Sequence, residues 1–172
     1  MPNPYLTELS QVGIIVRDLR TAMEYYWKEL GVGPWKIFKF APPELTETTV
    51  RGIKKPFGMK VGLATSKSWM IELIEPLEGR SIYNEFLESR GPGQHHMAYY
   101  LHENIERAEE YFQKRGIAVL QSGRFSRASF RSYFAYLDTE KELGTVIELL
   151  KRWGELPQPD ETYPSASSPP LA

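Results

Sequence analysis

The sequence has no cysteine, no long apolar run and almost no net charge, and each absence removes a class of protein. Without cysteine there is neither a disulfide framework nor a thiolate metal site. No apolar run approaches the roughly 20 residues that span a bilayer, so we expect no membrane partner. A net charge of −1 gives no electrostatic reason to expect nucleic acid. The N-terminal residues lack the basic and apolar regions of a secretory signal, which predicts a cytoplasmic protein.

What the sequence does contain is an internal repeat. A strand-like run begins at Gln11, and the helical stretch after it ends at Gly31, 20 residues further on. A second strand-like run begins at His96, and its helical stretch ends at Gly116, again 20 residues further on. Self-similarity at a fixed spacing is the signature of duplicated structural units. We therefore expect two equivalent modules.

Each copy closes on a strand with the sequence Ile-Glu-Leu, which places one carboxylate among apolar residues. Glu72 follows Gln11 by 61 residues, and Glu148 follows His96 by 52 residues, so the second copy has the shorter middle. A carboxylate between two β-forming residues is costly to bury unless it is paired or binds a cation. The two glutamates are therefore the first candidates for a functional site.

The order of apolar and polar residues predicts an α+β fold of two tandem βαβββ modules that enclose a cleft under a mixed-sheet half-barrel. Asp18 is placed as an N-cap, and the apolar positions that follow lie on one face of a helix. Residues 41–57 read as a long loop with room for some strand. The expected organisation is a domain over 1–154, with module one at about 8–77, a connecting helix at about 78–92 and module two at about 93–152, followed by a Pro/Ser-rich tail over 155–172.

Four polar side chains occupy matched places in the repeat: Gln11, Glu72, His96 and Glu148. Because side chains alternate across a strand, one inward polar residue from each of four strands can converge in the cleft. An amide oxygen, two carboxylates and one imidazole suit a divalent metal ion with open coordination positions. His95 cannot face the same side as His96 if the strand alternates regularly, so we assign the ligand to His96.

Other side chains are weaker candidates for the cleft. Lys60, Trp35, Tyr99 and Arg131 lie on or beside predicted strands and are candidates for substrate binding. Aromatic residues on strands are also normal core and cross-strand partners, and arginines that flank strands are often surface residues. Both interpretations therefore stay open for this group.

The chain resembles the vicinal oxygen chelate superfamily, which is also called glyoxalase-like. The resemblance rests on the segments Glu72–Leu77 and Gly93–Ala98, which are similar to methylmalonyl-CoA epimerases. The first-strand ligand of those epimerases is usually histidine, whereas the Gln-Glu-His-Glu set here resembles the metal site of eukaryotic glyoxalase I. Lys60 lies near the place of a catalytic glutamate in the epimerases, so the resemblance does not extend to methylmalonyl-CoA as the substrate.

The resemblance implies a metal-dependent isomerase, epimerase or lyase that acts through a metal-stabilised enolate on a small carbonyl compound. Glu72 and Glu148 are the expected catalytic residues, a divalent metal ion is the expected cofactor, and a homodimer is the expected assembly. Two alternatives remain open at this stage. One is a ring-cleaving dioxygenase of the same superfamily, and the other is a metal-free protein of the bleomycin-resistance kind that sequesters a ligand.

Overall fold

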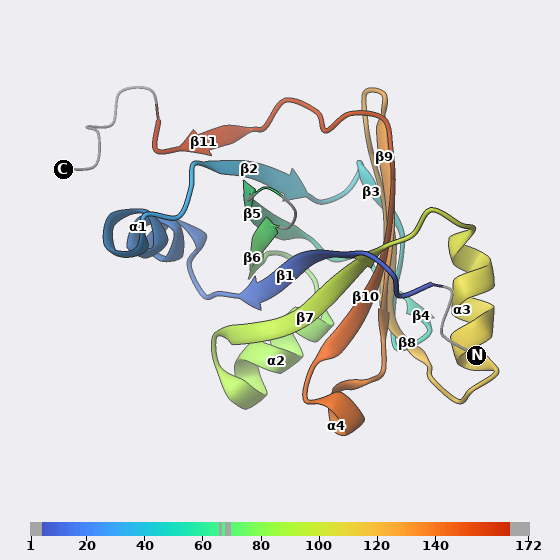
Figure 1. The fold of residues 1–172 in the computed structure, drawn as a ribbon. Coiled ribbons are helices and arrows are strands. Elements are labelled where there is room, and N and C mark those ends of the chain that lie inside the picture. Colours follow the sequence, from blue (N-terminus) through green and yellow to red (C-terminus); the bar gives the residue numbers. More distant parts are fainter. Residues whose placement is uncertain (1–4, 66, 68–69, 166–172) are drawn as a thin grey trace.

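The two copies of the repeat form one continuous mixed sheet, because their first strands pair with each other (Figure 1). β1 (Leu9–Ile15) runs antiparallel to β7 (Gly93–Tyr100), and each also pairs in parallel with the last strand of its own copy. The structure, a computed structural model, describes residues 5–65, 67 and 70–165. The sheet order is β11-β2-β5-β6-β1-β7-β10-β9-β8-β3-β4. The other strands are β2 (Trp35–Phe40), β3 (Leu45–Val50), β4 (Ile53–Lys54), β5 (Met59–Thr65), β6 (Met70–Pro76), β8 (Val119–Arg127), β9 (Phe130–Leu137), β10 (Val146–Trp153) and β11 (Glu161–Tyr163).

The helices occupy equivalent places in the two copies, which confirms the predicted βαβββ plan. α1 (Leu19–Leu30) and α3 (Ile105–Gln113) each follow the first strand of a copy, and each covers its own hydrophobic cluster against the sheet. α2 (Ile82–Arg90) connects the copies, and α4 (Glu140–Leu143) is a single turn before β10. The predicted cap is confirmed, since Thr21 N donates a 2.6 Å hydrogen bond to Asp18 Oδ1. Among the described residues, no helix is long and apolar enough to cross a membrane.

The sheet is strongly curved, because side chains from its two wings meet inside it. Phe40 on β2 and Phe125 on β8 are separated by six strands in the sheet order, yet their ring centroids are 4.2 Å apart. The inner face holds one large apolar cluster, to which α2 adds Ile82, Tyr83 and Phe86. The other face holds the two clusters under α1 and α3. The curved inner face is the predicted half-barrel.

The long loop expected over 41–57 contains two strands. β3 leaves the first copy and pairs antiparallel with β8, the outer strand of the second copy, and β4 returns beside β3. Thr49 and Thr48 are β-branched residues that favour an extended chain. The insertion accounts for the longer middle of the first copy, and it ties the two copies together at the far edge of the sheet.

Part of the segment expected as a Pro/Ser-rich tail joins the sheet. β11 pairs antiparallel with β2, and Tyr163 is 8% exposed in the cluster under α1. Asp160 Oδ2 accepts a 2.7 Å hydrogen bond from Lys39 N and thereby anchors the start of the strand. Low hydrophobicity hid this segment from sequence reasoning, because a single aromatic residue and an open strand edge suffice to order it. Residues 166–172 of the tail, and Trp69 in the β5–β6 turn, lie outside the described residues.

Candidate metal centre

The four central strands of the sheet each present one of the four residues predicted as ligands. In sheet order, Glu72 lies on β6, Gln11 on β1, His96 on β7 and Glu148 on β10. Each copy of the repeat supplies its first strand and its last strand to this central group. The duplication therefore places the four residues side by side without any special loop.

The strand register arranges these residues in two short rows, each with a small residue in the middle. Glu72 and His96 both pair with Gly13, while Gln11 and Glu148 both pair with Ala98. Gly13 is essential to this packing, because a Cβ atom built there would lie 1.8 Å from His96 Cε1. The imidazole of His96 thus fills the space that a side chain at position 13 would need.

Three of the four residues converge on one point. His96 Nε2 lies 3.2 Å from Glu72 Oε2 and 3.2 Å from Glu148 Oε2. Within the described part of the chain, these three residues form a group whose ligand atoms all lie within 4.8 Å of one another. Separations near 3.2 Å are those of neighbouring ligand atoms that each lie about 2.0–2.2 Å from a common ion.

The chemistry of the group also fits a cation. Glu148 is 4% exposed, and its Oε2 atom is buried without an aligned hydrogen bond, although it lies near the imidazole. A buried carboxylate oxygen without a hydrogen-bond donor is costly unless a cation neutralises it. Two carboxylates and an imidazole suit a divalent ion. Glu72, His96 and Glu148 are therefore the residues that would hold a metal.

The two carboxylates control the charge of His96. Burial by itself lowers the pKa of His96, but Glu148 and Glu72 outweigh this effect and raise the pKa to about 9. Burial also raises the pKa of Glu148, and the neighbouring imidazole opposes that rise. Without a metal, a protonated His96 therefore neutralises part of the negative charge. A metal ion would replace that proton.

His95 and His96 both turn toward the inner side of the sheet, contrary to the regular alternation expected from the sequence. The register of β7 against β1 steps from His96 at Gly13 to Gln94 at Ile14, so His95 is the extra residue of a β-bulge. The Nδ1 atoms of the two imidazoles lie 3.1 Å apart. Burial, the charge of His96 and the charge of Arg90 lower the pKa of His95 to about 2, so His95 is neutral. His96, rather than His95, contacts the carboxylates.

Gln11 lies beside the three-residue group, but its amide makes a different contact. Gln11 Oε1 accepts a 2.6 Å hydrogen bond from Arg152 Nη2. Gln11 Nε2 is buried and has no hydrogen-bond partner. The oxygen that would coordinate a metal is thus already engaged by a cationic donor.

The four predicted substrate-binding residues lie away from Glu72, His96 and Glu148, which together form a carboxylate–imidazole group. Trp35 is fully buried in the cluster under α1, and Tyr99 packs against the cluster under α3. Lys60 alternates with inward-facing neighbours and forms a 3.6 Å ion pair with Glu161. Arg131 lines a pocket of about 350 Å³ together with Arg124, Ser126, Ser132 and Trp153.

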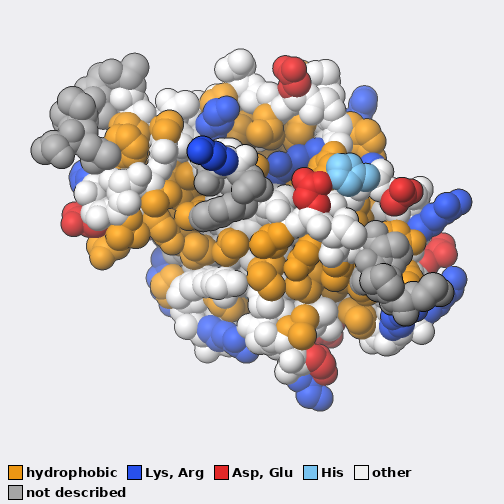
Figure 2. Space-filling model, in the orientation of Figure 1, with side chains coloured by type: hydrophobic (Ala, Val, Ile, Leu, Met, Phe, Trp, Pro, Cys, Tyr) orange, Lys and Arg blue, Asp and Glu red, His pale blue; other side chains and the backbone are white. Residues whose placement is uncertain are grey.

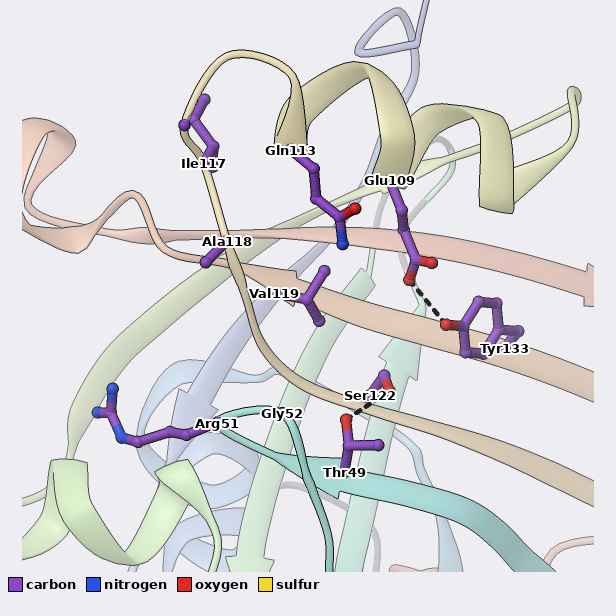
Figure 3. A pocket seen from close by; sticks show the side chains of 11 residues that line it. Thr49, Arg51, Gly52, Glu109, Gln113, Ile117, Ala118, Val119, Ser122 and Tyr133 are labelled. Atoms are coloured by element: carbon purple, nitrogen blue, oxygen red, sulfur yellow. Dashed lines mark hydrogen bonds between the residues drawn. The ribbon is translucent and has the colours of Figure 1, made fainter.

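A larger pocket of about 670 Å³ lies between α3 and the β3–β8 pair (Figure 3). In Figure 3, Glu109 points from α3 toward Tyr133, whose hydroxyl donates a 2.7 Å hydrogen bond to Glu109 Oε1. Thr49 and Ser122 are joined by a 2.8 Å hydrogen bond on the opposite side. None of the eight residues singled out from the sequence lines this pocket.

Sequence reasoning missed Gly13 and Arg152, although the repeat contained a signal for both. Gly13 is two residues after Gln11, and its counterpart Ala98 is two residues after His96, so both copies carry a small residue at this place. Arg152 is four residues after Glu148 on the same strand, and alternation puts the two side chains on one face.

A model of a protein family, described as the Glyoxalase/Bleomycin resistance protein/Dioxygenase superfamily, matches residues 10–136. No curated protein matches the sequence. A solved structure of a hypothetical protein from Bacillus halodurans C-125 has a TM-score of 0.65 at 20% identity and covers 88% of this chain and 98% of its own. Methylmalonyl-CoA epimerase from Mycobacterium tuberculosis has a TM-score of 0.58 at 23% identity, with coverage of 88% and 92%. A variant of the Streptomyces coelicolor epimerase in complex with 2-nitronate-propionyl-CoA has a TM-score of 0.54 at 24% identity, with coverage of 85% and 97%.

Proposed function

Because the chain belongs to the Glyoxalase/Bleomycin resistance protein/Dioxygenase superfamily, we propose that it is a metal-dependent isomerase, epimerase or lyase. Its substrate is a small carbonyl compound that loses a proton from the carbon next to the carbonyl group. The observation that carries the proposal is the convergence of Glu72, His96 and Glu148 on one point. All three residues come from one chain, so the group is complete without a partner.

A divalent ion in this group would supply Lewis-acid stabilisation of the negative charge that develops on the carbonyl oxygen. Glu148 is the residue that we assign as the proton acceptor, because it is a buried carboxylate within the group and a positioned carboxylate can take a proton from carbon. The proton moves from carbon to a carboxylate oxygen, and the electron pair of the broken C–H bond spreads onto the carbonyl oxygen.

Glu72, in its protonated form, is assigned to deliver a proton taken up from solvent to the other side of the carbon, while Glu148 releases the abstracted proton to solvent. Its strand, β6, and the strand of Glu148, β10, lie on opposite sides of the central β1–β7 pair. The two carboxylates therefore flank His96 from opposite directions, each at 3.2 Å from Nε2. Removal of a proton on one face and return on the other is isomerisation or epimerisation, and it needs no oxygen.

Lys60 lies near the place of a catalytic glutamate in the epimerases, so the assay should cover more substrates than that of the epimerases. Its side chain pairs with Glu161 and not with the carboxylate–imidazole group, so it does not replace a catalytic carboxylate. Methylmalonyl-CoA, which is bound in a solved structure of a similar epimerase, is the first compound of the panel. Other acyl thioesters and 2-oxo acids complete it. The homodimer remains a prediction, and light scattering in solution tests it.

The test is isotope exchange in D₂O with Co²⁺-loaded protein. We expect deuterium at the carbon next to the carbonyl group, detected by mass spectrometry, with no oxygen consumed. Glu148→Gln should slow the exchange by about 10²-fold or more, since a positioned base contributes that much. Glu109→Gln changes a half-buried carboxylate outside the group and should leave exchange unaffected. Oxygen uptake coupled to turnover would favour a dioxygenase, and binding without exchange would favour a sequestering protein.

A further inference from the structure

Beside the carboxylate–imidazole group lies a pair of side chains that the proposed chemistry does not use. Arg152 is half-buried, and its Nη2 donates to Gln11 Oε1 at 2.6 Å. Gln11 is 1% exposed, and its Nε2 has no acceptor. An arginine and an amide N–H group thus meet at the inner face of the sheet with donors left over.

Arg152 is directed toward the centre of the sheet by the register of the strands. Gln11 lies in the same row as Glu148, and Arg152 is four residues beyond Glu148, or about 13 Å along the strand. To reach Gln11 Oε1, the Arg152 side chain must lean back toward Glu148. The positive charge of Arg152 accordingly acts on Glu148, where it lowers the pKa of that carboxyl group against the larger effect of burial.

Among the described residues, the Arg152 guanidinium forms no ion pair, although its charge acts on Glu148 from a distance. Arg127, Arg124 and Arg80 each form ion pairs with carboxylates, whereas Arg152 forms none with any residue in 5–65, 67 and 70–165. Its side-chain partner is the neutral amide of Gln11. A half-buried guanidinium that meets only a neutral acceptor keeps its attraction for an external anion.

We propose that Gln11 and Arg152 form a carboxylate-recognition element, and that the substrate is a carbonyl compound that carries a carboxylate group. The two oxygens of a carboxylate can accept from the guanidinium and from Gln11 Nε2 together. Gln11 then acts as a donor to substrate, with its orientation set by Arg152. This inference rests on the proposed function, because it names the substrate class of the same site.

Malonate is the probe, and malonamide is its neutral counterpart of the same shape. In calorimetric titrations of Co²⁺-loaded protein, we expect malonate to bind at least 10-fold more tightly than malonamide. Arg152→Gln should weaken malonate binding about 10- to 100-fold, the usual effect of losing a charge-assisted hydrogen bond. Co²⁺ affinity, measured separately, should change less than 3-fold. Arg131→Gln is the matched control and should leave malonate binding unchanged, because the strand register places Arg131 on the opposite face of the sheet from Arg152.

A second variant keeps the proposal testable if Arg152→Gln unfolds. Gln11→Glu preserves the shape and supplies Arg152 with an internal carboxylate, so malonate affinity should fall while Co²⁺ is still bound. Equal binding of malonate and malonamide, or equal losses in the Arg152 and Arg131 variants, would overturn the inference. Failure of the wild-type protein to bind Co²⁺ would instead contradict the proposed function. Malonate titrated into metal-free protein would then still test the element.

Discussion

Single side-chain atoms decide whether the four central strands can hold a cation. The clearest case is Gly13, where the absence of a Cβ atom leaves room for the ring of His96. His96 is itself fully buried, so its ring cannot swing away into solvent. The position of the imidazole therefore depends on a residue that has no functional group.

Gly13→Ala should displace His96 and weaken metal binding, because the new methyl group would lie 1.8 Å from His96 Cε1. Overpacking of this kind costs about 1–3 kcal/mol of folding free energy. We expect Co²⁺ affinity to fall by at least 10-fold in a calorimetric titration. Gly93→Ala is the matched control on β7, since the nearest side chain to its Cβ would be Phe86 at 4.0 Å. Equal Co²⁺ affinity in both variants would contradict this role of Gly13.

The contacts of Gln11 show where residue-level prediction from sequence ends. The strand that carries Gln11, β1, lies among the four central strands of the sheet. The direction of the Gln11 amide is set by Arg152, which is 141 positions away in the chain. A hydrogen bond between such distant residues depends on register and on side-chain length, and neither is visible in a local pattern.

At the scale of elements, the strands and helices with strong patterns were predictable, and the strands that depend on a neighbour's edge were not. Alternation and capping located α1 and the strands that flank it. β3 and β11 are extended because β8 and β2 offer them free edges. A short segment with few apolar residues has little intrinsic tendency to form a strand, so its partner decides.

Removal of β11 should destabilise the protein. A chain that ends at residue 154 loses the burial of Tyr163 under α1 and the bond from Lys39 N to Asp160. Loss of one buried aromatic side chain costs on the order of 3 kcal/mol. For a domain of this size we expect the melting temperature to fall by about 5–10 °C in calorimetry.

The control for this truncation is a chain that ends at residue 165, which keeps β11 and every contact described for it. Its melting temperature should match that of the full chain. If the chain that ends at 154 melts at the same temperature as this control, β11 contributes no stability in solution.

At the scale of the whole molecule, charge is balanced by mixing and not by separation. Figure 2 shows one face on which basic and acidic side chains are interspersed around a largely hydrophobic middle. This pattern agrees with the net charge of −1. The notable concentration of charge is internal, where Glu72, His96 and Glu148 meet between the two copies.

The stability of the metal-free protein should therefore depend on pH with two limbs. The folded pKa of His96 is about 9, above its ordinary 6.5, so its contribution is complete below pH 6.5 and is lost as pH rises through 9. The folded pKa of His95 is about 2, so its contribution is complete above pH 6.5 and is lost as pH falls toward 2. Each limb changes the free energy of unfolding by up to about 1.4 kcal/mol per pH unit.

Urea unfolding between pH 5 and pH 9 in EDTA measures both limbs, and the raised pKa of Glu148 adds to the loss of stability as pH rises above 4.5. Bound Co²⁺ requires neutral His96, so the alkaline limb should disappear when the metal is present. A metal-free protein that gains stability from pH 6.5 to pH 9 would contradict the charge assignment of His96.

Gln11 and His96 hold matched places in the repeat but are chemically different, which has a consequence for the orientation of a substrate. If both copies supplied the same residue there, the site would have twofold symmetry. A substrate rotated by half a turn would then contact the same residues. With an amide and an arginine at one corner and an imidazole at the other, the two poses are no longer degenerate. The duplicated site with two different corners therefore favours one of two substrate orientations, and a planar prochiral carbon held there would present a defined face to each carboxylate.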